Sequence, residues 1–249
     1  MRTYATAQLI GDCSHQCDAT ATYTAPSGAQ AFVLCDGIGS NDAVRRWTRA
    51  QARRLAVIAA RKGDAETGLR SLYNHIAAQR AQRDPWTRDE MPKACALVAV
   101  TAPDRPMTVA WCGDVRAYVL VRGTVQRLTA DHNLRRVWPP RNGRPGGNRN
   151  RITSCLGAIE TDEETMNLHN HPAIESVTRG PEDCRLLLAS DGAYEPHEDA
   201  GHQLAKFLIG DVDELAEAFV DTAVATARAV PDPYADNATA LIADIRTAA

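Results

Sequence analysis

The sequence lacks the features that would place it in a membrane or among disulfide-rich secreted proteins. Its 249 residues contain no run of about 18 apolar residues, the length that a membrane-spanning helix needs. The first residues, Met1–Gln8, contain no apolar core of signal-peptide length. The seven cysteines form no CxxC pair, and several lie in or beside apolar runs, which is typical of reduced core thiols. We therefore expect a cytoplasmic protein without a membrane partner.

Two further absences bear on organisation and partners. No clear Pro/Gly/Ser-rich linker divides the chain, so we predict a single domain over residues 1–249. The formal net charge is −3, so the chain as a whole has no excess of positive charge with which to attract nucleic acid. We expect no nucleic-acid partner.

What the sequence does contain is a set of aspartates placed next to short apolar runs. Asp36 and Asp191 each follow such a run and precede a glycine, and Asp236 opens the last apolar segment. Short apolar runs that end in Asp-Gly predict buried strands that stop in a turn. A single aspartate of this kind is most simply a turn residue. Three can converge, and converging carboxylates suit Mg²⁺ or Mn²⁺.

Further short motifs extend this series along the chain. In order, they are Cys17-Asp18, Phe32–Gly39, Gly113–Tyr118, Leu128–His132, Ile152–Gly157, Leu186–Gly192 and Asp236–Thr239. Together they resemble the ordered motifs of the metal-dependent protein phosphatases of type 2C, the PPM family, in its compact bacterial form. The resemblance spans nearly the whole chain and needs no large insertion. Each motif is weak alone, whereas seven in one order make the resemblance specific.

The resemblance implies an α+β fold, an α-β-β-α sandwich of two mainly antiparallel sheets flanked by helices. The sequence pattern agrees, because strand-like segments joined by short hairpins favour antiparallel pairing. Strands are expected near residues 4–10, 19–24, 29–35, 94–101, 107–112, 116–121, 125–128, 185–189 and 238–245. Apolar residues at helical spacing predict helices near residues 44–58, 69–76, 204–208 and 215–223.

The resemblance also implies a site for two divalent ions, Mn²⁺ or Mg²⁺. Asp36 would bridge the two ions, and the carbonyl of Gly37 would complete the shell of one of them. Asp18 would hold a metal-bound water. Two ions about 3.5–4 Å apart lower the pKa of a bridging water and screen the phosphoryl oxygens, so no nucleophilic side chain is needed. Catalysis would depend on Asp18 and Asp36.

Three more aspartates complete the implied metal set. Asp191 and Asp236 would ligate one ion of the pair, and Asp114 would help to form a third, weaker position. The main rival class of phosphatase uses a cysteine nucleophile with an arginine six residues later, and none of the seven cysteines has an arginine there. We therefore predict metal-dependent hydrolysis of phosphoserine and phosphothreonine in proteins that a Ser/Thr kinase has phosphorylated.

One departure from the family pattern leaves a second function open. Five residues before the position of Asp18, family members usually carry an arginine that binds the substrate phosphate, and here that residue is Cys13. Cys17, the residue directly before Asp18, stands where Glu, Gln or Asn is usual in the family. Loss of a guanidinium removes a charge-assisted contact worth at most roughly a few kcal/mol. The alternative is a weak or inactive pseudophosphatase that binds a phosphoprotein.

The segment 135–151 departs most from the family pattern. It contains six arginines and Trp138 among prolines and glycines, and no acidic residue. Such a composition cannot bury a core and predicts a mobile surface loop. The simplest interpretation is a solvated loop. The functional interpretation is a basic flap in which Arg141 and Arg144 bind phosphorylated or acidic substrates in place of the missing arginine.

Several other polar residues are predicted to have structural roles. His132, within a family motif, is expected to be structural rather than catalytic. Arg116 is expected to pair with a nearby carboxylate or to support the sheet. His169 and His171 are expected to lie in a solvated loop rather than to ligate a metal.

Overall fold

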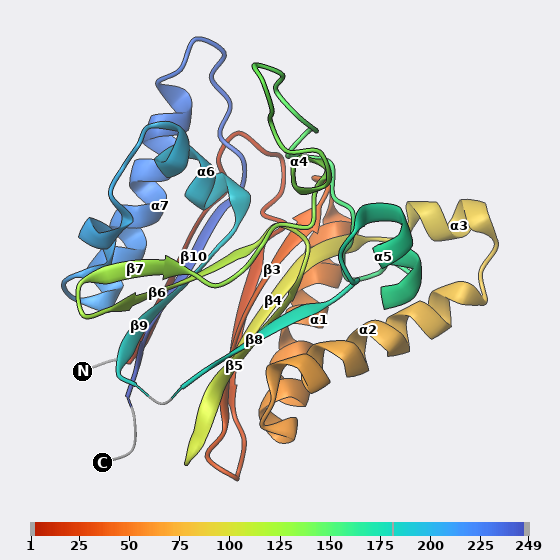
Figure 1. Ribbon diagram of the computed structural model, residues 1–249, viewed down its shortest axis with the longest axis horizontal. Helices are drawn as coiled ribbons and strands as arrows, with labels where there is room; N and C mark the ends of the chain where they lie inside the picture. The colour runs from red at the N-terminus through yellow and green to blue at the C-terminus, as the bar shows by residue number, and fades with distance from the viewer. Residues whose placement is uncertain (1–2, 181, 247–249) are drawn as a thin grey trace.

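Two antiparallel sheets packed face to face form the centre of the protein, with helices on both outer sides (Figure 1). The computed structural model describes residues 3–180 and 182–246. Within these residues each sheet has five strands, and all neighbouring strands are antiparallel. The predicted fold class, an α-β-β-α sandwich, is confirmed.

Each sheet combines strands from distant parts of the sequence. In spatial order, the first sheet contains β1 (Tyr4–Leu9), β10 (Ala238–Ile245), β9 (Cys184–Ala189), β6 (Arg116–Val121) and β7 (Thr124–Arg127). The second sheet contains β2 (Ala19–Thr24), β3 (Gln30–Ile38), β4 (Lys93–Ala102), β5 (Arg105–Cys112) and β8 (Glu175–Arg179).

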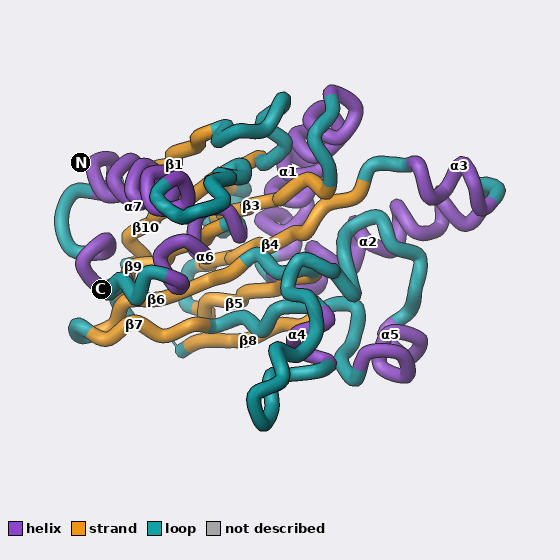
Figure 2. The backbone as a smooth tube through the Cα atoms, turned by 90° about the horizontal axis from the view of Figure 1, so that it is seen from above, coloured by secondary structure: helices purple, strands orange, loops and turns teal. Residues whose placement is uncertain are grey.

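The helices form the two outer layers, which Figure 2 shows from above on opposite sides of the strands. The second sheet is covered by α1 (Asp42–Lys62) and α2 (Ala65–Ala81), which is followed by α3 (Pro85–Glu90). The first sheet is covered by α6 (Asp191–Asp199), the 3₁₀ helix η1 (Leu204–Leu208) and α7 (Val212–Arg228). The connection between β7 and β8 contains α4 (Leu134–Val137) and α5 (Asp162–His169).

Strand β3 shows why the central strands have continuous apolar runs. Its residues 31–35 are at most 1% exposed, because one side of the strand faces helices and the other faces the opposite sheet. Phe32 and Leu34 belong to the core between the sheets, whereas Val33 and Cys35 belong to the core under α1 and α2. Since side chains alternate along a strand, burial on both faces requires an unbroken apolar sequence. The metal-site aspartate that follows this run is therefore carried by a rigid, fully packed element.

Two details at the motif aspartates differ from the prediction that each strand stops in a turn. β3 continues through Asp36 to Ile38, and Asp36 still pairs with Cys95 of β4. Asp191 does not enter a turn but is the first residue of α6. This helix was not predicted, because Gly192 and Pro196 lie within it and both residues disfavour helix interiors.

Some other elements also differ from the sequence expectation. Residues 204–208 form one short 3₁₀ helix rather than a regular helix. The edge strand β8 was not predicted, because its sequence, Glu-Ser-Val-Thr-Arg, contains one apolar residue. Helix α5 was likewise missed, although Thr161 and Glu164 form a capping box at its start. Helix α4 occupies the beginning of the segment predicted as a loop over residues 135–151.

Among the described residues, no helix is both long enough and apolar enough to cross a membrane.

Candidate metal centre

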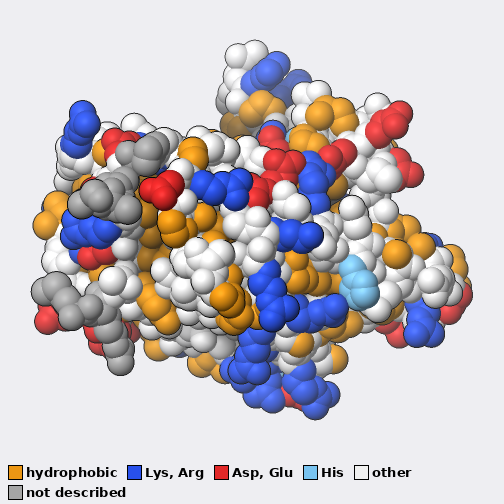
Figure 3. Space-filling view, turned by 90° about the horizontal axis from the view of Figure 1, so that it is seen from below, with side chains coloured by type: hydrophobic (Ala, Val, Ile, Leu, Met, Phe, Trp, Pro, Cys, Tyr) orange, Lys and Arg blue, Asp and Glu red, His pale blue; other side chains and the backbone are white. Residues whose placement is uncertain are grey.

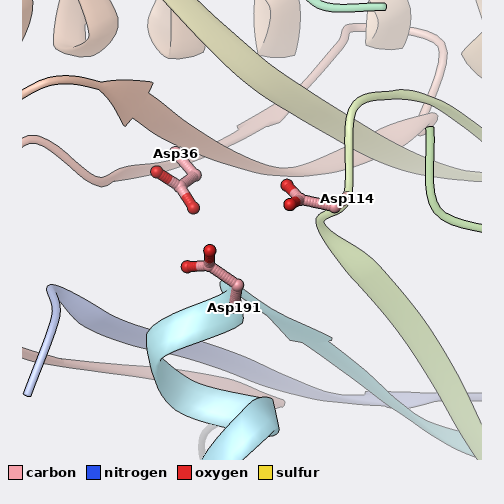
Figure 4. A group of neighbouring side chains, drawn as sticks. All are labelled: Asp36, Asp114 and Asp191. Atoms are coloured by element: carbon pink, nitrogen blue, oxygen red, sulfur yellow. The ribbon is translucent and has the colours of Figure 1, made fainter. Parts of the chain in front are cut away.

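Three aspartate side chains from distant parts of the sequence point toward one another between the two sheets (Figure 4). Asp36 lies near the end of β3, Asp114 in the loop between β5 and β6, and Asp191 at the start of α6. One carboxylate oxygen from each lies within 4.8 Å of one from each of the others. Asp114 is buried, and the other two are half-buried. The structure therefore brings together three of the predicted metal ligands.

Two glycines allow the backbone to approach closely at this site. At Gly37, an added Cβ would lie 2.7 Å from the Cys17 carbonyl oxygen and from atoms of Thr48, so the residue can contribute only backbone groups. Gly113, directly before Asp114, has φ of +100°, and its Cβ would lie 2.3 Å from Sγ of Cys95. Glycine is the residue that this conformation favours. These constraints set the position of the Gly37 carbonyl and of the Asp114 carboxylate.

Asp18 lies beside this group, but its carboxylate has no hydrogen-bond donor among the described residues. It precedes β2, is 1% exposed, and neither carboxylate oxygen accepts a hydrogen bond from any described residue. Burial and the charges of Asp191 and Asp236 raise its pKa to about 7, although the Thr239 and Ser190 hydroxyls, which lie near but outside hydrogen-bonding geometry, act in the opposite direction. A buried carboxylate without a donor is costly unless it binds a cation or a proton.

The other carboxyl groups of the site repel one another in the same way. Burial raises the pKa of Asp36 well above its usual range, and the charges of Asp18 and Asp191 raise it further. Burial and the charge of Asp191 also raise the pKa of Asp114. Burial and the charge of Asp236 raise the pKa of Asp191. A set of oxygen donors with unbalanced negative charge fits a hard divalent cation such as Mg²⁺ or Mn²⁺.

Asp236 lies at the edge of this group and is exposed. Its Oδ1 accepts hydrogen bonds from the backbone N–H of Asn237, at 2.7 Å, and from the thiol of Cys13, at 3.0 Å. The Cys13 sulfur also lies 3.2 Å from the hydroxyl of Tyr234. Cys13 is thus placed directly beside a predicted metal ligand.

A cavity of about 360 Å³ opens onto the aspartates. It is lined by Cys13, Asp36, Gly37, Ile38, Gly39, Ser40, Cys95, Asp114, Asn150, Ile152, Asp191, Tyr234, Asp236 and Asn237. None of these described lining residues is lysine or arginine. The described side chains that line this cavity therefore supply no positive charge to a bound phosphate.

The arginines predicted to bind substrate lie away from the cavity walls. Arg141 and Arg144 are exposed and face each other across a single backbone bridge in the segment that projects beyond the sheets after α4 (Figure 1). Arg149 lines a neighbouring cavity together with Asp191, but it already forms ion pairs with Glu195 and Asp199. The predicted role of Arg141 and Arg144 stays a prediction.

Histidine 132 supports the turn that carries Asp114. It is fully buried, and its backbone N–H donates to the Gly113 carbonyl at 2.9 Å. Its Nδ1 faces the Gly113 N–H at 3.4 Å, while Nε2 lies 2.8 Å from a carboxylate oxygen of Glu175. Burial lowers the pKa of His132. His132 is not among the described residues that line the aspartate cavity. Its position and its burial agree with the predicted structural role.

The prediction of a solvated loop at the other two histidines is wrong for His171. This residue is 1% exposed, its ring stacks on His132 with centroids 4.2 Å apart, and Nε2 contacts the Thr153 hydroxyl at 2.8 Å. His169 ends α5 and is half-buried. The local sequence did not indicate this burial, because Thr153 and His132, which contact the ring of His171, are distant in the sequence.

The predicted pairing of Arg116 is confirmed. Its guanidinium donates two hydrogen bonds to Asp131, at 3.0 and 2.8 Å, and one to Glu198 at 2.7 Å. It also lies over the ring of Tyr194, 3.7 Å from the centroid. Tyr194 in turn donates to the Asp114 carbonyl at 2.9 Å. This buried network connects α6, which begins with a metal-site aspartate, to the Asp114 loop.

Comparisons with known proteins show the family to which the chain belongs. Residues 10–136, just over half of the chain, match the family model of protein phosphatase 2C. The chain therefore belongs to the protein phosphatase 2C family. The matched region contains Asp18, Asp36 and Asp114, whereas Asp191 and Asp236 lie beyond it.

One curated relative and several solved structures are similar to the chain. The human protein named "Probable protein phosphatase 1N" is 27% identical over 187 residues, which cover 68% of this chain and 43% of the human protein. The chain thus spans less than half the length of this relative. The Streptococcus agalactiae serine/threonine phosphatase superposes with a TM-score of 0.71 at 16% identity, covering 96% of this chain and 97% of that chain. The Mycobacterium tuberculosis serine/threonine phosphatase PstP/Ppp superposes with a TM-score of 0.67 at 19% identity, covering 98% of each chain. At these identities, the structures show a shared fold.

The repulsion at the site predicts how the metal-free protein responds to pH. The pKa of Asp18 is about 7 in the folded protein and 3.8 in the unfolded chain, so folding favours the protonated carboxyl. This stabilisation is complete below pH 3.8 and is lost as pH rises through about 7. In EDTA, we expect the free energy of unfolding to fall between about pH 5 and about pH 8, with about 3 kcal/mol of the fall due to Asp18. Urea unfolding of the parent and of Asp18→Asn measures this contribution.

The Asp18→Asn protein should show a smaller fall over the same pH range, because the amide does not titrate. A parent whose stability rises with pH in EDTA, or a variant with the same pH dependence as the parent, would contradict the proposed electrostatic strain.

Proposed function

We propose that this protein hydrolyses phosphoserine and phosphothreonine in proteins with the help of divalent metal ions. The observation that carries the proposal is the convergence of Asp36, Asp114 and Asp191 beside the unpaired, buried Asp18. Side chains that repel one another would not be gathered at a cavity without a counter-charge. Membership of the protein phosphatase 2C family and the similarity to a human protein named as a phosphatase support the same activity.

Each residue of the site would have a separate role in holding the metal ions. Two ions, Mn²⁺ or Mg²⁺, with a third in a weaker position, would supply an activated water and positive charge for the phosphoryl oxygens. Asp36 would bridge the pair, and Asp191 and Asp236 would ligate one of them. Asp114 would help to hold the third ion. Every proposed side-chain ligand is a carboxylate on a different element or loop, so the site is complete only in the folded chain.

Gly37 and Asp18 would complete the site. Gly37 would offer its carbonyl, since the packing around it leaves no room for a side chain. Asp18 would orient a water by accepting its hydrogens, because both carboxylate oxygens lack a donor among the described residues. These roles differ from those of the converged aspartates. Gly37 would provide a neutral carbonyl oxygen, and Asp18 would act through a water molecule.

The absence of lysine and arginine from the described cavity wall determines how substrate would bind. Where other family members use an arginine, the thiol of Cys13 donates to Asp236 instead. Neutralisation of the phosphate would therefore depend on the metal ions and on any basic residues that reach over the cavity. We propose Arg141 and Arg144 for this second role, since they lie on the projecting basic segment. The substrate would be a protein that a Ser/Thr kinase has phosphorylated.

The cysteines support a proposed cytoplasmic location. All seven are free, and five of them, including Cys35 and Cys112, are buried. Burial raises the pKa of both of these thiols, which keeps them protonated and unreactive. Reduced core thiols of this kind are usual in the cytoplasm.

The activity should depend wholly on metal held by the aspartates. Asp36→Asn removes the carboxylate that would bridge the ions, so we expect Mn²⁺ affinity to be lost and turnover to fall by roughly 10³-fold, the scale of losing a central electrostatic contact. Hydrolysis of a phosphothreonine peptide and of p-nitrophenyl phosphate, with Mn²⁺, Mg²⁺ or EDTA, measures the effect. Asp104→Asn is the matched control, because Asp104 is exposed and lies on the β4–β5 hairpin.

The control should retain full activity, and Asp36→Asn should unfold cooperatively like the parent. Undiminished hydrolysis by the parent in EDTA, or an Asp36→Asn protein as active as the parent, would rule out this mechanism.

Cys13 should limit the affinity for small phosphoesters. In Cys13→Arg, a guanidinium at the cavity wall can form paired hydrogen bonds to the phosphate, so we expect KM for p-nitrophenyl phosphate to fall by roughly tenfold. In Arg141→Gln/Arg144→Gln, we expect a rise in KM for phosphopeptides that exceeds the rise for p-nitrophenyl phosphate. Steady-state kinetics at saturating Mn²⁺ measure both changes.

Unchanged kinetics in both variants would mean that neither position meets the substrate. A Cys13→Arg protein with lower kcat and unchanged KM would show instead that the new side chain pairs with Asp236.

A further inference from the structure

Helix α1 concentrates positive charge in a protein that is negative overall. Its 21 residues include six arginines and one lysine but one acidic residue, Asp42, so the helix has a net charge of +6. The chain has a net charge of −3, so the remaining residues together have a net charge of −9. Positive charge is therefore concentrated on this helix, as it also is on the projecting segment 135–151.

The cations of α1 lie on its outer side. Its apolar side, which includes Val44, Leu55 and Ala59, is buried against the second sheet. Figure 3 shows lysine and arginine side chains gathered at the edge of the molecule where α1 lies. The exposed cations are Arg46, Arg49, Arg53, Arg54, Arg61 and Lys62, which we call the α1 basic face.

Most of this face has no internal counter-charge. Asp42 pairs with Arg45 and Arg46 in the first turn of the helix. In residues 3–180 and 182–246, no carboxylate forms an ion pair with any of the other five members of the α1 basic face. Arg49 and Arg53 are four residues apart, and like charges at this spacing destabilise a helix by a few tenths of a kcal/mol. An anionic partner would relieve this repulsion.

The α1 basic face begins at the rim of the aspartate cavity. Gly39 and Ser40 line the cavity, and Asn41 caps the first turn of α1 directly after them. Arg46 is little more than one turn into the helix. From Arg46 to Arg61 the helix rises about 22 Å, at 1.5 Å per residue. An extended peptide of about seven residues has the same length, at about 3.3 Å per residue.

We propose that the α1 basic face binds an acidic segment of the phosphoprotein substrate, a few residues away from the phosphorylated side chain. This inference rests on the proposed function, because it requires the phosphorylated residue to enter the cavity next to the face. Arginine is well suited to this role, because its guanidinium forms paired hydrogen bonds with carboxylates.

A short acidic segment fits the face better than a larger polyanion does. The apolar side of α1 is buried in the core, so the helix has no apolar surface to insert into a lipid bilayer. A membrane surface or a nucleic-acid duplex extends beyond the helix and meets the rest of the protein, whose net charge is −9. A single acidic segment of this length can contact the α1 basic face alone.

Charge reversal on the face tests the proposal. Arg49→Glu/Arg53→Glu removes two unpaired cations, and Arg83→Glu/Lys206→Glu is the matched control, because it changes the net charge equally at exposed positions outside α1. The substrates are phosphothreonine peptides with six Asp or Glu residues on either side of the phosphothreonine. Matched peptides with Ser and Gln at the same positions, and p-nitrophenyl phosphate, serve as references.

For one of the two acidic peptides, we expect a KM about tenfold below that of its neutral match at low salt. The α1 double variant should lose this preference while its kcat and its hydrolysis of p-nitrophenyl phosphate stay unchanged, and the control variant should retain it. About 0.5 M salt should also abolish the preference, because it screens exposed charges. Equal KM values for acidic and neutral peptides, or an equal loss in the control variant, would overturn the proposal.

Direct binding separates this inference from the proposed activity. Fluorescence anisotropy of the labelled acidic peptides reports docking even if the protein hydrolyses nothing, a result that would refute the proposed function alone. Binding that needs Arg49 and Arg53 supports the acidic-segment proposal. In a third outcome, the protein binds phosphatidylserine vesicles or a DNA duplex through Arg49 and Arg53 and binds neither acidic peptide. That result would overturn the proposal that an acidic protein segment binds this face.

Discussion

Mutual repulsion among clustered carboxylates is the constraint on which the rest of the structure depends. Asp36, Asp114 and Asp191 converge within 4.8 Å, and Asp18 is buried nearby without a hydrogen-bond donor among the described residues. Each pKa is raised, so the folded chain without cations is under electrostatic strain. The remainder of the fold must hold these groups together against that strain, and divalent cations would turn the same arrangement into a stabilising one.

The sandwich meets this requirement by attaching each carboxylate to a well-packed element. Asp36 is on β3, a central strand buried on both faces, and Asp191 starts α6, which packs on the other sheet. The Arg116 network links α6 to the Asp114 loop through Tyr194. Positive charge, by contrast, is kept off the cavity wall and placed on α1 and on the projecting segment. The protein thus separates the groups suited to cations from those suited to anions.

The sequence predicted the sheets better than it predicted the surroundings of the site. β6 and β10 have the expected bounds, because continuous apolar runs and hairpin spacing specify buried antiparallel strands. The convergence of the aspartates followed from the family resemblance, not from spacing alone. Helix α6 was hidden by Gly192 and Pro196, and the burial of His171 depends on tertiary contacts. The contact of Cys13 with Asp236 joins residues 223 positions apart, which no local pattern reveals.

The central claim is that the aspartates form a two-ion site, and anomalous diffraction from crystals grown with Mn²⁺ tests it most directly. The account predicts two manganese peaks about 3.5–4 Å apart, with Asp36 in contact with both and Asp191 in contact with one. A data set collected at the manganese edge locates the ions independently of any activity. Manganese peaks only at other residues, or no peak at Asp36 and Asp191 at millimolar Mn²⁺, would contradict the account.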